Sequence, residues 1–349
     1  MDSLLEIYSK VYKNKKQYNW QYYNNSYVNP NYDKAIDEGL EIFGSQQTNS
    51  FIQSIFQRGL KSELAKSFDE LSDERSLHVA SVFFMGHFLA KKLVIFNELF
   101  NYKSKTNVTR FDFSWFWFLC ALYHDAFFDK EKIDNNNSNY TSNYSYASAS
   151  RGLLYDKTTI EKYDIFRKTN GRNDHGIHAA SELTKNYSSL ENTPDNYQSN
   201  ILVTEESKEC ICKIAKVIAC HNIFICLSDK DKNEYTKAGL QNLIPSVTDS
   251  CKMPQSKGFF ELLYLLLCIC DVLEPTKRNI NLNQLQLSTK DKNQIIIRFE
   301  SNADNTVIAN YNNYIKNIID AECWLNYIKV NYSKSDNNKY RINILFCND

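Results

Sequence analysis

The sequence is poor in glycine and proline, with 9 and 5 of these residues in a chain of 349. Turn-rich β proteins use both residues at their turns, so this scarcity favours long helices. Hydrophobic residues make up 43% of the chain, which is enough for a large core. The length allows one elaborated domain or two.

Net charge and cysteine metal motifs are also absent. Lysine plus arginine and aspartate plus glutamate both number 41, so nothing in the overall charge indicates binding to nucleic acid or to an acidic membrane. None of the ten cysteines forms a Cys-x-x-Cys spacing. Many lie in apolar helical stretches, which predicts reduced core residues of a cytosolic protein.

No targeting or membrane-spanning segment is visible. The first residues, MDSLLEIYSKVYKNKK, lack the basic-then-apolar order of a signal peptide. The longest apolar run, around Leu262 to Cys270, is too short to cross a bilayer. We therefore expect a soluble, cytoplasmic protein without a membrane partner.

The most informative stretch runs from Trp115 to Asp129 and reads WFWFLCALYHDAFFD. Its apolar run predicts a buried helix that ends in the adjacent pair His124 and Asp125. Burying an imidazole beside a carboxylate is costly unless something neutralises them, and a metal ion would do so. The alternative is a core histidine followed by a helix-terminal aspartate.

A second helix is predicted from its start signal, with Ser72 as N-cap and two acidic residues in the first turn. His78 lies on its apolar stripe, whereas His87 falls about 180° away and is predicted to be a surface residue. Arg75, one turn before His78, either projects towards the same site or is a solvated charge. The stripe comprises Val82, Met85, Leu89, Leu93 and Phe96.

A helix beginning DHGIHAASELTKNY offers two histidines. His175 shares a face with Ala179 and Leu183, while His178 shares its face with Glu182. This phase predicts that His175 points inward and His178 outward, although residues of a first turn can break the rule.

Two later helices carry one ionisable residue each on an apolar stripe. His221 follows Ile214 and Ile218, and Asp271 follows Leu267 before Pro275 ends its helix. A single aspartate in so apolar a helix needs a partner, and a cation is the simplest candidate. Together, the five helices predict a mixed nitrogen and oxygen site with enough ligands for two divalent ions. The proposed ligands are His78, His124, Asp125, His175, His221 and Asp271.

We predict three regions. Residues 1–70 form an N-terminal helical layer, 71–280 a metal-binding helical domain with a polar insertion at about 130–170, and 281–349 a C-terminal strand-helix-strand extension. The low-complexity run Asn135 to Ser150 is either a passive insertion, which we favour, or a mobile lid.

In the third region, NQIIIRFES and KYRINILF predict strands, with a helix from about Asn305 to Tyr332 between them. This extension would serve equally as an α/β appendage or as a dimerisation element, so a homodimer stays open.

The ordered set of ligands resembles the HD-domain superfamily of metal-dependent phosphohydrolases, named for a His-Asp pair. The phrases RSLHVASVFFMGHFL, DHGIHAASEL, IACHNIF and CDVLEP resemble a bacterial HD subfamily over roughly residues 72 to 280. The resemblance implies an all-α HD-domain helical core with a small C-terminal α/β extension. Ala126 to Phe128 follow the pair in place of Gly-Lys, and His221 lacks an adjacent second histidine. These departures weigh against the subgroups that cleave cyclic dinucleotides.

The implied activity is hydrolysis of a phosphate ester, most plausibly a nucleotide, by water that two divalent ions activate. Asp125 would bridge the ions, whose identity among Mn, Mg, Co, Fe and Zn the ligands do not distinguish. Arg75, Lys277 and Arg278 would neutralise substrate phosphate, and Asp129 or His178 would protonate the leaving group. A di-iron oxygenase with the same ligands and a non-catalytic nucleotide-binding sensor stay open as alternatives.

Overall fold

The structure, a computed structural model, describes residues 2–13, 73–101, 113–125, 205–221, 258–299, 304–319, 328–334 and 340–346, and also His175, Gly176, Ala179, Ala180 and Leu183. Four sequence predictions concern parts of the chain outside this description. Asp129, His178 and the run Asn135 to Ser150 lie outside the described residues, as does the side chain of Arg75.

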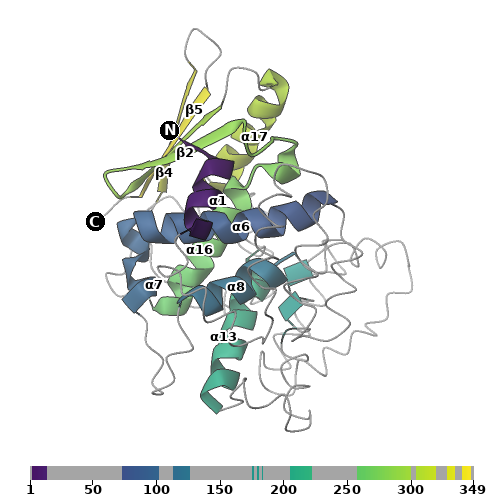
Figure 1. The fold of residues 1–349 in the computed structure, drawn as a ribbon, viewed down its shortest axis with the longest axis vertical. Helices are drawn as coiled ribbons and strands as arrows, with labels where there is room; N and C mark the ends of the chain where they lie inside the picture. The colour runs from purple at the N-terminus through teal and green to yellow at the C-terminus, as the bar shows by residue number, and fades with distance from the viewer. Residues whose placement is uncertain are drawn as a thin grey trace, which may run out of the picture.

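Four helices surround the predicted ligands (Figure 1). They are α6 (Asp73–Lys92), α8 (Phe113–Tyr123), α13 (Glu205–Cys220) and α16 (Phe259–Leu273). Helix α6 begins directly after Ser72, as its N-cap signal predicts. It packs against α8 and α16, and α13 packs against the same two helices. In α16, every residue from Leu262 to Leu273 is buried, which explains why this helix is apolar on all sides.

Shorter helices cover the outside of α6. Helix α1 (Leu4–Lys13) packs on it through Tyr8, whose hydroxyl lies 2.7 Å from the Ser81 hydroxyl. After α6, the chain continues through η2 (Val94–Phe96) and α7 (Asn97–Asn101). The N-terminal segment is therefore part of the same packed body as the predicted site.

The strands form one five-stranded antiparallel sheet in the order β1-β2-β3-β5-β4. Their bounds are Asp2–Ser3, Leu285–Lys290, Gln294–Phe299, Ile328–Lys334 and Tyr340–Phe346, for β1 to β5. Alternate side chains are buried, including Leu285, Leu287, Ile295, Ile297, Ile342 and Ile344. This period of two gives the sheet one apolar face, which packs on the helices.

The prediction of an all-α HD-domain core with a small C-terminal α/β extension is wrong. The described residues form a mixed α/β fold in which the sheet and the helices share one hydrophobic core. Strand β1, at the start of the chain, pairs with β2, and the rings of Phe96 and Phe346 lie 6.3 Å apart. The physical reason is that the apolar face of the sheet has to be buried, and the helices supply the opposing surface.

The predictions for the C-terminal region are confirmed in part. Strands β3 and β5 confirm the two predicted strands. The helix expected to reach Tyr332 ends much earlier, as α17 (Asn305–Ile319), and β4 follows it. The first five residues of β4 belong to the stretch that we predicted to be helical, although Ile328, Val330 and Tyr332 alternate with polar residues as in a strand. The sequence analysis also missed β2, which pairs with β3 across the turn at Asp291 to Asn293.

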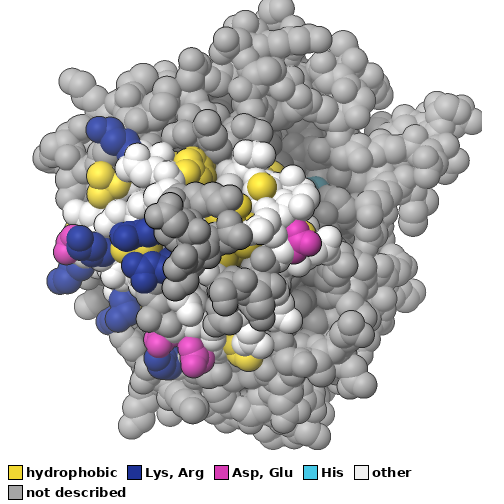
Figure 2. All heavy atoms as spheres, turned by 90° about the horizontal axis from the view of Figure 1, so that it is seen from above, with side chains coloured by type: hydrophobic (Ala, Val, Ile, Leu, Met, Phe, Trp, Pro, Cys, Tyr) yellow, Lys and Arg dark blue, Asp and Glu magenta, His cyan; other side chains and the backbone are white. Residues whose placement is uncertain are grey.

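Charge is not spread evenly over the described surface, although the whole chain is neutral. Figure 2, which views the molecule from above, shows lysine and arginine side chains gathered on one side of that face. In the sheet and its turns, Lys290, Lys292, Arg298 and Lys329 are exposed. Among the described residues, no helix is long and apolar enough to cross a membrane.

Candidate metal centre

The fold brings all six predicted metal ligands into one buried cluster. His78 lies in the second turn of α6, and Asp271 lies in the last turn of α16. His124 and Asp125 follow directly after α8, and His221 follows directly after α13. Each of these five side chains is at most 3% exposed, and His175 is 8% exposed. Helix ends therefore position most of the cluster.

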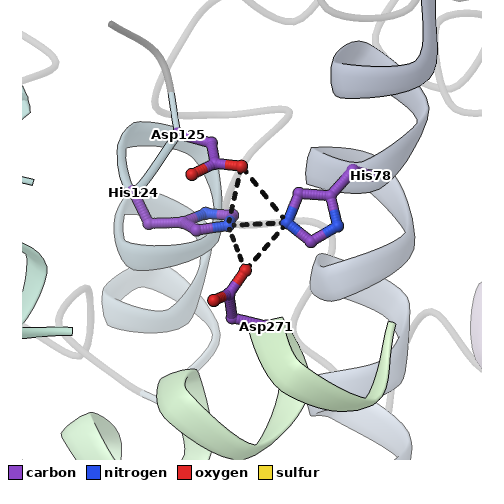
Figure 3. A group of neighbouring side chains, drawn as sticks. All are labelled: His78, His124, Asp125 and Asp271. Carbon is purple, nitrogen blue, oxygen red and sulfur yellow. Dashed lines mark hydrogen bonds and ion pairs between the residues drawn. The ribbon is translucent and has the colours of Figure 1, made fainter. Parts of the chain in front are cut away.

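Four of the six ligands form a first group, shown in Figure 3. His78 Nε2 lies 3.1 Å from His124 Nε2, 3.0 Å from Asp271 Oδ1 and 3.4 Å from Asp125 Oδ2. His124 Nε2 lies 3.6 Å from Asp271 Oδ1 and 4.0 Å from Asp125 Oδ2. Ligand atoms held about 2.1 Å from one ion are about 3.0–3.4 Å apart when adjacent and up to about 4.2 Å apart when on opposite sides of the ion. The spacing within the first group therefore fits a single divalent ion.

The second group consists of Asp125, His175 and His221. Asp125 Oδ1 lies 2.7 Å from His175 Nε2, while its other oxygen faces the first group. The rings of His175 and His221 are 5.2 Å apart between centroids. Asp125 thus presents one oxygen to each group, which is the arrangement required of a ligand that bridges two ions.

Backbone carbonyl groups orient two of the histidines. His124 Nδ1 lies 2.6 Å from the Ala121 carbonyl oxygen, and His221 Nδ1 lies 2.6 Å from that of Ile218. A carbonyl oxygen only accepts, so each Nδ1 carries the proton and donates it. In the neutral imidazole, the Nε2 lone pair then faces the cluster, as in metal-binding histidines.

Gly176 allows His221 to lie this close to the helical turn that carries His175. A Cβ atom at Gly176 would lie 2.7 Å from the Ile218 carbonyl oxygen and 3.1 Å from the His221 ring. From the sequence, Gly176 was part of the DHGIH motif and had no predicted role. Its role follows from tertiary contact.

Glu274 is a component of the site that the sequence analysis did not assign. Its carboxylate accepts a hydrogen bond from His78 Nδ1 at 2.7 Å and two further bonds from the Thr276 backbone N–H and hydroxyl. Glu274 is fully buried. It thereby directs His78 Nε2 towards the cluster. The signal for it was its position three residues after Asp271 on the same face.

The carboxylates are held in their charged forms. Burial raises the pKa of Asp125, but the neighbouring His124 and His175 more than offset this, and the pKa lies well below its usual range. The pKa of Asp271 is likewise well below the usual range, because Lys277 and the hydrogen-bonding histidines outweigh burial. Ionised carboxylates in a buried cluster need positive charge nearby.

The charge state of His221 differs from that of His78. Burial, followed by the proximity of His175 and His124, lowers the pKa of His221 to about 3. His221 is therefore a neutral imidazole near pH 7, and its buried Nε2 has no hydrogen-bond partner among the described residues. For His78, burial and Lys277 lower the pKa, but the hydrogen bonds that the ring donates to Asp271 and Glu274 outweigh them and raise it. A lone pair buried without a partner is what a metal ion would satisfy.

Lys277 and Arg278 belong to η5 (Thr276–Arg278), which closely follows the helix that carries Asp271. Lys277 Nζ donates a hydrogen bond to Asp271 Oδ1 and lies 3.5 Å from His78 Nε2. Burial lowers the pKa of Lys277, but the charge of Asp271 and other neighbours outweighs it and raises the pKa. The Arg278 guanidinium lies 3.5 Å over the ring of Tyr314, which belongs to α17. Of the two cations that we predicted for phosphate binding, Lys277 therefore lies against the ligands, while the described contacts of Arg278 are with Tyr314 and the Lys277 carbonyl oxygen.

The prediction that His87 is a surface residue is wrong. His87 is fully buried, between the rings of Phe83 and Phe113 at centroid distances of 4.8 and 5.5 Å. By helix phase, its side chain is about 180° from that of His78 on α6, and Phe113 of α8 covers it there. Periodicity identified the direction, and only packing decided the exposure.

Comparisons of the chain with family models, with curated proteins and with solved structures each found no match.

Proposed function

We propose that the protein is an HD-type metal-dependent phosphohydrolase acting on a phosphate ester, with a nucleotide as the substrate class. One observation carries this proposal. Six buried histidine and aspartate side chains form two groups that share Asp125, and the Nε2 atoms of His124 and His221 face into them.

The residues present fit divalent ions. His78, His124, Asp125 and Asp271 would hold one ion, and Asp125, His175 and His221 would hold a second. Mixed imidazole and carboxylate ligands suit Mn²⁺, Fe²⁺, Co²⁺ or Zn²⁺ better than a soft thiophilic ion. When bound, the ions would lower the pKa of a water molecule and polarise the phosphoryl oxygens.

The rest of the chemistry belongs to the side chains of this chain. Lys277 places positive charge at the first group, where the phosphate of a substrate would need neutralisation, and Arg278 adds a second cation at the next position in the chain. Glu274 fixes the orientation of His78 and keeps its Nε2 directed at the cluster. We also propose the cytoplasm as the compartment, which the free, buried thiols of Cys120 and Cys270 support.

The test is elemental analysis of the purified protein, followed by a phosphate-release screen over nucleotides with Mn²⁺, Mg²⁺, Co²⁺, Fe²⁺ or Zn²⁺. His124→Ala and Asp125→Ala should each remove most of the bound metal and the activity. The matched control is His87→Leu, which changes a buried histidine outside the cluster and should retain metal. Wild-type metal content in both cluster variants would refute the site.

The same experiment separates the other two functions. Oxygen consumption by iron-loaded protein without phosphate release would identify an oxygenase. Nucleotide binding without turnover in any metal would identify a sensor.

A further inference from the structure

Lys277 occupies part of the position that a metal ion would need. Its Nζ donates to Asp271 Oδ1 and lies 3.5 Å from His78 Nε2, and its side chain is only 9% exposed. The same Asp271 oxygen lies 3.0 Å from His78 Nε2 and 3.6 Å from His124 Nε2. A single carboxylate oxygen thus faces both the lysine and the first group of ligands.

The lysine compensates for buried negative charge. Asp125, Asp271 and Glu274 are all at most 3% exposed, and buried carboxylates destabilise a fold unless cations or hydrogen bonds offset them. Among the lysines and arginines of the described residues, Lys277 is the one whose charged atom lies within hydrogen-bonding distance of Asp271. Removing it from a metal-free site would leave that carboxylate without its ammonium partner.

We propose that Lys277 is an internal cation of the site, which neutralises Asp271 in the absence of metal and which a divalent ion displaces on binding. This inference rests on the proposed metal site. The ion and the ammonium group compete for Asp271 Oδ1, and their like charges repel each other strongly at such short range. The four-carbon stem of lysine is flexible enough to let the ammonium move away.

Displacement would also give Lys277 its second role. Arg278, the next residue in the chain, is held over the Tyr314 ring, so its guanidinium has a defined position. An ammonium released from Asp271 would join Arg278 in binding the phosphate of the substrate. Phosphate binding through Lys277 would then depend on prior metal binding.

Affinity for Mn²⁺ tests the competition. Lys277→Met removes the competing charge and should bind Mn²⁺ about tenfold more tightly than wild type in a calorimetric or spin-resonance titration, a coupling of ordinary size. The matched control, Arg278→Met, removes a charge from the adjacent residue without touching Asp271. It should change the affinity by less than about threefold, because its charge acts only at longer range. Equal or weaker binding by Lys277→Met would overturn the proposal.

A measurement on the wild-type protein avoids any folding defect of the variant. Amine labelling with acetic anhydride, followed by mass spectrometry, should modify Lys277 several-fold faster in Mn²⁺-loaded than in metal-free protein. The exposed Lys290 provides the internal reference. Labelling of Lys277 that stays constant or slows on metal addition would contradict displacement. If wild-type protein binds no Mn²⁺ at all, the metal site itself fails. If wild-type protein binds Mn²⁺, but Lys277→Met has the wild-type affinity and the labelling of Lys277 does not change with metal, only the proposed role of Lys277 is refuted.

Discussion

At the scale of single residues, Glu274 links the cluster to the rest of the fold. It accepts the His78 Nδ1 hydrogen bond and is itself fixed by the Thr276 backbone N–H and hydroxyl. Burial raises the pKa of Glu274, but these bonds outweigh burial and lower it. A charged, immobile acceptor makes the facing imidazole a better metal ligand.

Glu274→Gln should therefore weaken metal binding while leaving the ligands in place. The amide still accepts a hydrogen bond but carries no charge, and we expect at least about a tenfold loss of Mn²⁺ affinity. Titration with Mn²⁺ measures this loss. Glu261→Gln, in the first turn of the same helix, is the control and should bind as wild type does. Unchanged affinity in Glu274→Gln would mean that His78 needs no orienting partner.

His87 makes the fold sensitive to acid independently of the cluster. Burial lowers its pKa from 6.5 to about 3. Between these values, the unfolded state binds a proton that the folded state does not, so the free energy of unfolding falls as the pH falls from 6.5 towards 3. Well below pH 6.5, the loss is about 1.4 kcal/mol per pH unit. Above pH 6.5, both states are neutral and His87 contributes no pH dependence.

His87→Leu should remove this contribution. We expect its free energy of unfolding to depend on pH less steeply than that of wild type, by about 1.4 kcal/mol per unit between about pH 5.5 and 4. Urea titrations across this range measure both slopes. Parallel curves for the two proteins would show that His87 is protonated in the folded state.

At the scale of elements, the contact between α6 and α8 depends on a missing side chain. A Cβ at Gly86 would lie 1.9 Å from Trp117 Cζ2. Trp117 is fully buried, and its indole N–H donates to the Phe83 carbonyl oxygen at 2.8 Å, so the ring has no room to retreat. This close packing brings α8, and with it the His124–Asp125 pair, against the helix that carries His78.

Gly86→Ala should consequently destabilise the protein by about 1–3 kcal/mol or more, because the added methyl overpacks the helix contact. The free energy of unfolding in urea measures the effect. Gly258→Ala is the matched control, since a Cβ there would meet only Glu261 Cδ at 3.9 Å. Equal stability of the two variants would show that α6 and α8 can separate without cost.

At the scale of the whole molecule, the sheet and the site are parts of one core. Tyr311 of α17 is fully buried and donates its hydroxyl hydrogen to the Leu273 carbonyl oxygen, next to Glu274. The Val94 backbone N–H donates to the Lys292 carbonyl oxygen at 2.8 Å, which ties η2 to the turn between β2 and β3. The C-terminal residues therefore support the helix end that carries Asp271.

A chain ended after Asn281 should not fold by itself, although it keeps every proposed metal ligand. Its loss of β2 to β5 and α17 would expose the surface of α16 that packs on α17 and the Phe96 ring that contacts Phe346. Circular dichroism during urea titration should show no cooperative transition. A cooperative transition near that of the full chain would mean that the helices form an independent domain.

The six clustered side chains could be predicted from the sequence, because each is an ionisable residue in or directly after an apolar helical stretch, where burial requires a partner. The sequence also determined the start of α6 and the strands β3 and β5, since caps and strong alternation are local signals. Only the tertiary structure decided that His87 is buried, that Glu274 holds His78 and that Lys277 faces Asp271. It alone decided that β1 and β2 complete a sheet packed on the helices. These features depend on contacts between residues far apart in the chain, and no local periodicity records which surfaces will meet.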